Sequence, residues 1–226
     1  MPTLRNARIS ISIDESTGAL TSLRDLKFGD ELLQHAGAVD GRAPVRIVCL
    51  DSTGNRVEFA PASVTSVSST DTRLQVEHGT CRATSGGNHE VSIACTWSIE
   101  AAPPATSESV WRVRLENRTD DLNVIEVMFP VLRGIAIGDR CENSVLVFPH
   151  HAGERIKDPV RAMTSKRYTE FWRGATVREA NGVYAREMNY CGLASMMWMD
   201  LYTEDEGTAR GIYTGSHDPT FVLTGI

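Results

Sequence analysis

The sequence has no cluster of lysine and arginine residues, and its acidic residues outnumber its basic ones. It contains 29 Asp and Glu residues against 23 Lys and Arg residues, which gives a formal net charge of -6 at pH 7. Binding to phosphate backbones needs clustered cations, so we expect no nucleic-acid partner. Long apolar runs are also missing, so we expect no membrane-spanning segment.

Cysteine is scarce and scattered along the chain. The five cysteines are Cys49, Cys81, Cys95, Cys141 and Cys191, and no two of them form a CxxC pair. Their wide spacing and odd number argue against a zinc site or a disulfide framework. We therefore expect no metal and no cofactor, and cysteines that act as small buried hydrophobic residues in a reducing compartment. The first residues lack the apolar stretch of a secretory leader, which predicts a cytoplasmic protein unless a leader has been removed.

Motifs for nucleophilic catalysis and phosphate binding are absent as well. No GxSxG sequence occurs, and Gly86-Gly87 is not followed by a helical pattern. Gly215-Ser216-His217-Asp218 contains Ser, His and Asp in succession. The members of a catalytic triad must converge from separate segments, so this run predicts no triad.

The pattern that dominates the chain is period-two alternation of apolar and polar residues. It is clearest over residues 91–99, where Val91, Ile93, Cys95, Trp97 and Ile99 share one face. Such strands recur at intervals of about ten residues with turn signals between them, and no helix of four turns is indicated. We predict an all-β fold with two large antiparallel sheets, a β-sandwich that forms a single domain over residues 1–226. Residues 149–194 lack the alternation and are predicted to form one long irregular loop region.

The segment 198–218 predicts a hairpin with polar and aromatic groups close together. Trp198 and Tyr202 have flat apolar faces, while Asp200, His217 and Asp218 offer hydrogen-bonding and titratable groups. Aromatic platforms beside carboxylates suit a sugar, which has apolar faces and a rim of hydroxyl groups. These five residues are therefore candidate carbohydrate-binding residues.

The predicted loop region adds three further candidates for carbohydrate binding. His150 and His151 follow an apolar strand, and Trp172 is one of several aromatic residues in the loop. Adjacent residues on a strand point to opposite faces, which argues against a metal held by both histidines. A loop histidine bonded to a backbone carbonyl and a small aromatic core under the loop are the structural alternatives.

Carboxylates that lie close together would suit glycoside hydrolysis, which uses an acid and a base or nucleophile about 5–9 Å apart. Asp200 and Asp218 lie on neighbouring predicted strands, while Glu154 and Asp158 lie in the loop region. Acidic residues at strand ends more often bind water or turn amides. We therefore assign no catalytic residue on this basis.

Several motifs are similar to those of a known protein family. Residues 11–23 (Ile-Ser-Ile-Asp-Glu-Ser-Thr-Gly-Ala-Leu-Thr-Ser-Leu) resemble the opening hairpin of β-supersandwich domains in bacterial carbohydrate-active enzymes. The segments 148–153 (Phe-Pro-His-His-Ala-Gly), 198–202 (Trp-Met-Asp-Leu-Tyr) and 216–218 (Ser-His-Asp) resemble motifs of large bacterial glycoside hydrolases related to the endo-α-N-acetylgalactosaminidases. The resemblance implies a galactose mutarotase-like β-supersandwich.

In that family the supersandwich precedes a (β/α)₈ barrel, which holds the catalytic carboxylates. The resemblance therefore implies a non-catalytic accessory domain of a glycoside hydrolase, whose partners are a catalytic barrel and carbohydrate. The chain ends on the apolar run 221–226. That run fits either a fragment of a longer multidomain enzyme or a terminal strand placed in a sheet.

Three other interpretations remain open at the level of sequence. A stand-alone mutarotase-like enzyme would need a histidine acid and a carboxylate base, and His150 or His217 with Glu126, Glu154 or Asp200 could supply them. A polysaccharide lyase would need a tyrosine or histidine base beside a cation, for which Tyr168 with Arg167 or Lys166 is a weak candidate. A protein-interaction module would expose a broad apolar patch without convergent polar groups.

Overall fold

In the computed structural model of the chain, the described residues are 1–33, 43–85, 89–102, 106–138, 140–149, 153–164, 176–180, 183–187, 197–204 and 209–217. Their regular secondary structure is almost entirely antiparallel β-strand, which confirms the all-β prediction. The chain divides into two compact units, Met1–Ile135 and Ala136–Ile226. The prediction of a single domain over residues 1–226 stays a prediction.

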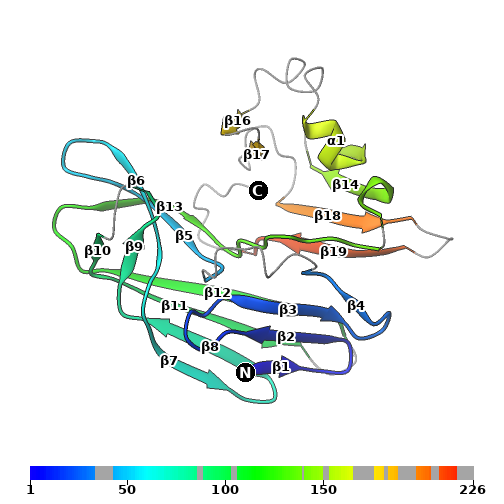
Figure 1. Ribbon diagram of the computed structural model, residues 1–226, viewed down its shortest axis with the longest axis horizontal. Helices are drawn as coiled ribbons and strands as arrows, with labels where there is room; N and C mark the ends of the chain where they lie inside the picture. The colour runs from blue at the N-terminus through cyan, green and yellow to red at the C-terminus, as the bar shows by residue number, and fades with distance from the viewer. Residues whose placement is uncertain are drawn as a thin grey trace. The chain divides into compact units, whose positions relative to one another are not determined.

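The first unit contains three hydrogen-bonded sheets among its described residues (Figure 1). One sheet has the order β1 (Thr3–Arg5), β2 (Ile9–Ile13), β3 (Leu20–Asp25) and β4 (Asp30–Glu31). A second has the order β10 (Glu90–Val91), β9 (Cys81–Ala83), β6 (Arg56–Pro61), β5 (Arg46–Leu50) and β13 (Asn123–Met128). The third has the order β12 (Ser109–Asn117), β11 (Ile93–Ala101), β8 (Arg73–His78) and β7 (Val64–Ser69).

Local turn chemistry explains the predicted hairpins of this unit. Between β5 and β6, the Asp51 carboxylate accepts hydrogen bonds from the backbone N–H groups of Thr53 (2.8 Å) and Asn55 (2.9 Å). Gly54 takes a φ of 83°, which a glycine adopts without strain. The side chains of the turn therefore stabilise the hairpin that β5 and β6 form.

The two large sheets expected from the sequence are not what the described strands form, since these strands are distributed over five sheets. The connection from β12 to β13 shows why. Asn117 closes a tight turn by donating from Nδ2 to the Leu122 carbonyl (2.8 Å) and accepting from the Thr119 N–H (3.0 Å). Yet β12 pairs with β11, while β13 pairs with β5. The chain changes sheets at this turn, and the sheet that each strand joins is set by distant partners.

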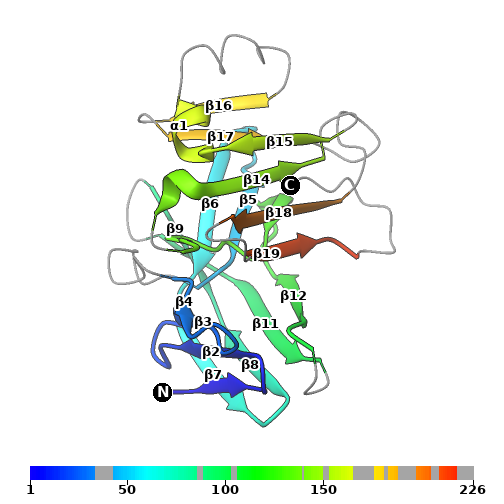
Figure 2. The ribbon, with the colours of Figure 1, turned by 90° about the vertical axis from the view of Figure 1, so that its right-hand side faces the viewer.

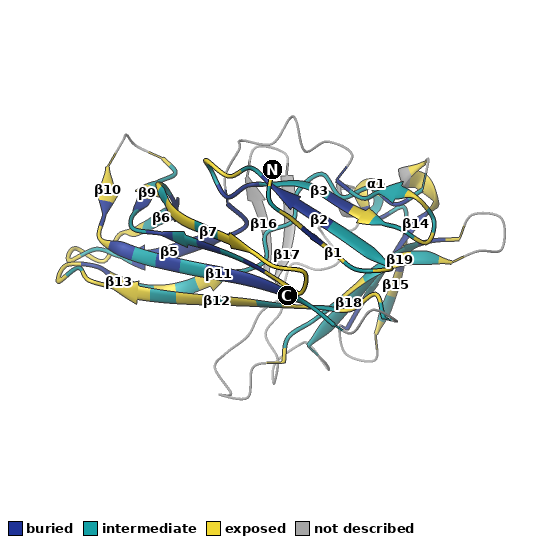
Figure 3. Ribbon diagram, turned by 90° about the horizontal axis from the view of Figure 1, so that it is seen from below, coloured by how far each residue is buried: buried dark blue, intermediate teal, exposed yellow. Residues whose placement is uncertain are grey.

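The core of the first unit comes from the apolar faces of these strands. Strand β11 is mostly buried, whereas its neighbour β12 alternates between half-buried and exposed residues (Figure 3). Each fully buried large side chain contributes about 1.5–3 kcal/mol relative to an exposed one. The largest buried apolar side chains in the first unit are Trp97, Phe59, Leu4, Ile11, Ile13, Ile47, Leu74, Ile93 and Ile99.

The second unit contains a four-stranded sheet and a separate strand pair among its described residues. The sheet has the order β15 (Glu154–Lys157), β14 (Ser144–Phe148), β18 (Trp198–Thr203) and β19 (Arg210–Gly215). The pair is β16 (Thr176–Ala180) with β17 (Val183–Glu187), and two short helices, η2 (Cys141–Asn143) and α1 (Pro159–Thr164), precede it. The prediction of one irregular region over 149–194 is therefore wrong in part, because this region contains regular elements. These elements, β15, α1, β16 and β17, are too short to show a periodic pattern in the sequence.

The described helices are short. None of them is long and apolar enough to cross a bilayer.

We expect the three described cysteines with placed side chains to be chemically inert in the folded protein. Cys49, Cys81 and Cys95 are all buried, and burial raises the pKa of each thiol, that of Cys81 to about 12. The thiolate is the nucleophilic form, so a raised pKa suppresses reaction. In a Cys141→Ser/Cys191→Ser variant, Ellman's reagent at pH 8 should label almost no thiol in the folded protein and all three in denaturant. Rapid labelling without denaturant would contradict the buried placement.

Candidate functional site

The predicted hairpin at residues 198–218 exists as β18 and β19, and it forms half of the second unit's four-stranded sheet. Figure 2 shows β15, β14, β18 and β19 side by side in this order. Asp200 is paired with Tyr213 on one side and with Val147 on the other, and Val147 is paired with Arg155. Cross-strand partners project from the same face of a sheet, so Arg155, Val147, Asp200 and Tyr213 form one row.

An aromatic pair lies at one end of this face. Trp198 precedes Asp200 by two residues and therefore projects from the same face. Its ring stacks on that of Tyr213, with a centroid separation of 5.8 Å and an interplanar angle of 29°. Gly215 is the cross-strand partner of Trp198, and a Cβ there would lie 3.0 Å from Tyr213 Oη. The absence of a side chain at position 215 therefore lets the tyrosine ring lie over the strand.

Asp200 lies between the aromatic pair and the apolar Val147. It is half-buried, and burial raises the pKa of its carboxyl group above the ordinary value. Within the described part of the chain, no hydrogen bond or ion pair involves its carboxylate. Asp200 is thus a carboxylate with apolar neighbours and an unused hydrogen-bonding capacity.

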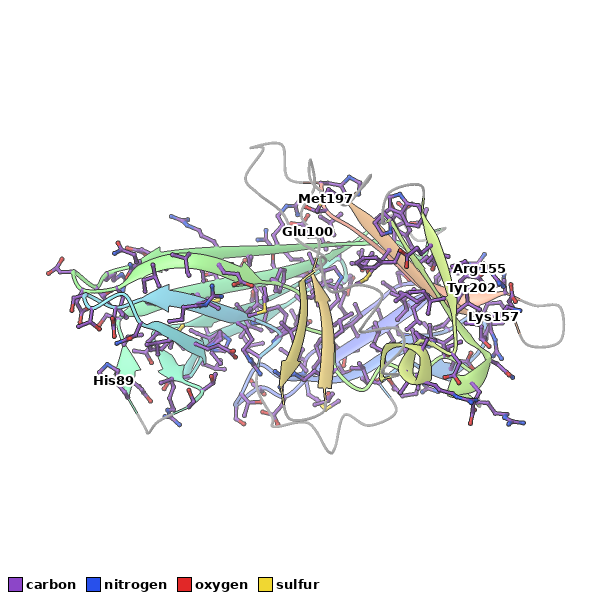
Figure 4. The ribbon with its side chains drawn as sticks, turned by 90° about the horizontal axis from the view of Figure 1, so that it is seen from above. His89, Glu100, Arg155, Lys157, Met197 and Tyr202 are labelled. Carbon is purple, nitrogen blue, oxygen red and sulfur yellow. The ribbon has the colours of Figure 1, made fainter. Side chains whose placement is uncertain are left out.

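A polar cluster made of Arg155, Tyr202 and Glu204 lies toward the other end of the face. Arg155 donates from Nε to Tyr202 Oη (3.0 Å) and from Nη2 to Glu204 Oε1 (2.5 Å). The hydrogen bond to Arg155 holds the pKa of Glu204 below its usual range, and the same bond raises the pKa of Arg155. Figure 4 shows Arg155 and Tyr202 beside each other with Lys157 nearby, while Met197 lies at the opposite end of β18. The polar groups of these three side chains therefore form hydrogen bonds with one another.

The other face of the sheet has an apolar row across all four strands. The register places Leu146, Leu201 and Ile212 in one row with Ile156, and Phe148 follows on β14. Phe148 and Ile156 are buried, with 3% and 8% of their surface exposed. The opposite face carries Trp198, Asp200, Tyr202 and Tyr213, and Tyr213 is exposed.

The structure therefore brings three of the predicted site residues together, namely Trp198, Asp200 and Tyr202. His217 lies two residues beyond the end of β19 and is exposed. His150, His151, Trp172 and Asp218 lie outside the described residues, so the predicted Asp200–Asp218 pair cannot be placed.

Two other carboxylates from the alternative interpretations are located elsewhere. Glu126 is in the first unit, where it forms an ion pair with Arg56 at 2.8 Å. Glu154 is paired in register with Phe148, so it projects from the packing face of the sheet. Neither residue shares the face that carries Asp200.

Two residues of the site were not predicted from the sequence. Tyr213 lies in the predicted second strand, but its position opposite Asp200 depends on the register across the turn, which alternation alone does not fix. Arg155 lies in the region expected to be irregular. Its four-residue strand offers no signal that sequence could have supplied.

The described residues offer no constellation for a metal. No group of three or more His, Cys, Asp or Glu side chains among them is arranged to hold a metal ion. The chemistry that the site does offer is aromatic stacking beside hydrogen-bond acceptors and one arginine.

Comparison of the chain with protein-family models, with curated protein sequences and with solved structures gave no match. The resemblance to bacterial glycoside hydrolases therefore depends on the short sequence motifs alone.

Proposed function

We propose that this chain is a non-catalytic accessory domain of a carbohydrate-active enzyme and that it binds carbohydrate on the face of β18 and β19. The observation that carries this proposal is the stacked pair of Trp198 and Tyr213. Tyr213 has 61% of its surface exposed, an unusual state for a large aromatic side chain. Exposed aromatic rings beside acceptor groups are suited to the apolar face and hydroxyl rim of a pyranose.

The finer architecture belongs to the same proposal. We propose a galactose mutarotase-like β-supersandwich. The similarity of residues 11–23 to such domains supports this. On this proposal, a (β/α)₈ barrel in the same enzyme supplies the catalytic carboxylates, and this chain supports it and contacts the substrate.

We expect removal of either aromatic ring to weaken sugar binding by up to about tenfold. A stacked aromatic contributes about 0.5–1.5 kcal/mol beyond its buried area, and about 1.4 kcal/mol corresponds to a factor of ten in affinity. A glycan array identifies ligands of the wild-type chain, and calorimetry then compares Trp198→Ala and Tyr213→Ala with it. Both variants should lose affinity for every ligand.

Phe28→Ala is the matched control, because Phe28 is an accessible aromatic of the first unit, where Lys27 Nζ lies 4.8 Å from its ring centroid. This variant should bind like the wild type. No binding to any glycan at millimolar concentration, or unchanged binding after loss of both rings, would contradict carbohydrate recognition at this face.

A further inference from the structure

Asp200 is the most unusual polar group on the proposed binding face. Its carboxylate is half-buried and makes no hydrogen bond or ion pair within the described residues, and its cross-strand neighbours are Val147 and Tyr213. Partial removal of a charge from water without a partner costs free energy, which is reflected in the raised pKa of the group. Groups held in such an unfavourable state are more common at functional sites than elsewhere.

The spacing around Asp200 fits one sugar ring. Adjacent strands lie about 4.8 Å apart, and residues on one face of a strand recur at roughly 7 Å. Asp200 is therefore one strand spacing from Tyr213 and one same-face step from Trp198. A ring stacked on the aromatic pair would place its hydroxyl rim over the carboxylate.

We propose that Asp200 is the polar anchor of this site and that it accepts hydrogen bonds from neighbouring hydroxyl or amino groups of a sugar stacked on Trp198 and Tyr213. The site then takes neutral and amino sugars, and it rejects uronates and sulfated sugars. This inference rests on the proposed function.

The charges around Asp200 account for the rejection of acidic sugars. A carboxylate or sulfate on the ligand would meet the Asp200 carboxylate, and like charges brought together at an interface are strongly unfavourable. The nearest cation in its row is Arg155, two strands away at about 10 Å, which exceeds the screening length of about 8 Å at physiological salt. Arg155 is also engaged with Glu204 and Tyr202, so it does not neutralise an acidic ligand beside Asp200.

The test compares three ligands of similar length: a neutral hexose oligomer, an amino-sugar oligomer and a uronate oligomer. The wild-type chain should bind the uronate at least tenfold more weakly than the other two. Asp200→Asn keeps the shape of the side chain but removes its charge, so it should weaken binding of the neutral oligomer about tenfold or more. It should also narrow the gap between neutral and acidic ligands.

Glu142→Gln is the matched control, because Glu142 is an exposed carboxylate of the same unit that lies on η2 and not on the sheet. This variant should keep the wild-type preference among the three ligands. The thermal midpoint of Asp200→Asn gives a second readout and should equal or exceed that of the wild type, because the variant removes a partly desolvated charge without breaking a bond.

The outcomes separate this inference from the proposed function. The neutral oligomer could bind through Trp198 and Tyr213 while Asp200→Asn binds it as well as the wild type does. In that case Asp200 is not the polar anchor, and the proposed function stands. If the wild-type chain prefers the uronate, the proposed role of Asp200 is also wrong. If no oligomer binds, or if loss of both aromatic rings has no effect, the proposed function fails and the inference fails with it.

Discussion

Lowering the pH from 6.5 to 4 should reduce the unfolding free energy of the first unit by about 3 kcal/mol through the single side chain of His78. His78 ends β8 and has 2% of its surface exposed. Burial lowers its pKa from 6.5 to about 4, and its interaction with the backbone of Ala62, outside good hydrogen-bonding geometry, offsets only part of this effect.

Burial favours the neutral form of His78 in the folded state, and the hydrogen bond from Trp97 fits that form. Trp97 Nε1 donates to His78 Nε2 at 3.3 Å, so Nε2 must be an acceptor and the imidazole hydrogen lies on Nδ1. Protonation would place a second donor against the indole N–H. The folded unit therefore resists protonation in a way that the unfolded chain does not.

The direction of the pH effect follows from the two pKa values. In the unfolded chain His78 takes up a proton near pH 6.5, whereas in the folded unit it does so only near pH 4. Between these values the unfolded state binds more protons, so stability falls as the pH falls. The contribution of His78 to the unfolding free energy is present above about pH 6.5. It is lost as the pH falls, and the loss is largest below about pH 4.

Urea unfolding at pH 7, 5.5 and 4 checks this expectation. His78→Gln keeps an acceptor for Trp97 but does not titrate. Its unfolding free energy should therefore fall by about 3 kcal/mol less than that of the wild type over this pH range. His89→Gln removes an exposed histidine of the same unit and should leave the wild-type pH dependence intact. Equal pH dependence in the wild type and His78→Gln would show that His78 does not carry the effect.

Sequence reasoning succeeded where a local pattern decides the structure. Ile93, Cys95, Trp97 and Ile99 were expected on one face of a half-buried strand, and all four are buried in β11. The hairpin that carries the candidate site was also predicted, because the turn between its strands and the alternation within them are local features.

The arrangement of sheets could not be predicted because it depends on contacts between distant segments. Strand β9 is three residues long and pairs with β6, some twenty residues earlier in the chain. Nothing in Cys81-Arg82-Ala83 encodes that partner. The row that joins Arg155 to Asp200 and Tyr213 has the same origin, since three separate pairings must all be in register to form it.

Replacing Trp97 with alanine should destabilise the first unit by about 3–5 kcal/mol, the usual cost of deleting a buried tryptophan. Trp97 has none of its surface exposed, and it is paired in register with Val76 on β8 and Val113 on β12. Its loss would open a cavity and would also remove the donor to His78 Nε2. The indole thus provides both packing and a hydrogen bond to the neutral imidazole of His78.

Two companion variants make this expectation specific. Trp97→Phe keeps most of the apolar volume, so its loss should be clearly smaller than that of Trp97→Ala. Trp111→Ala deletes the same residue type from the neighbouring strand, where Trp111 is half-buried and its ring lies 6.1 Å from that of Phe129. Its cost in urea unfolding should also be smaller, because a site that is already open to solvent leaves less of a cavity. A loss for Trp97→Ala no greater than that for Trp111→Ala would show that β11 does not form the centre of this core.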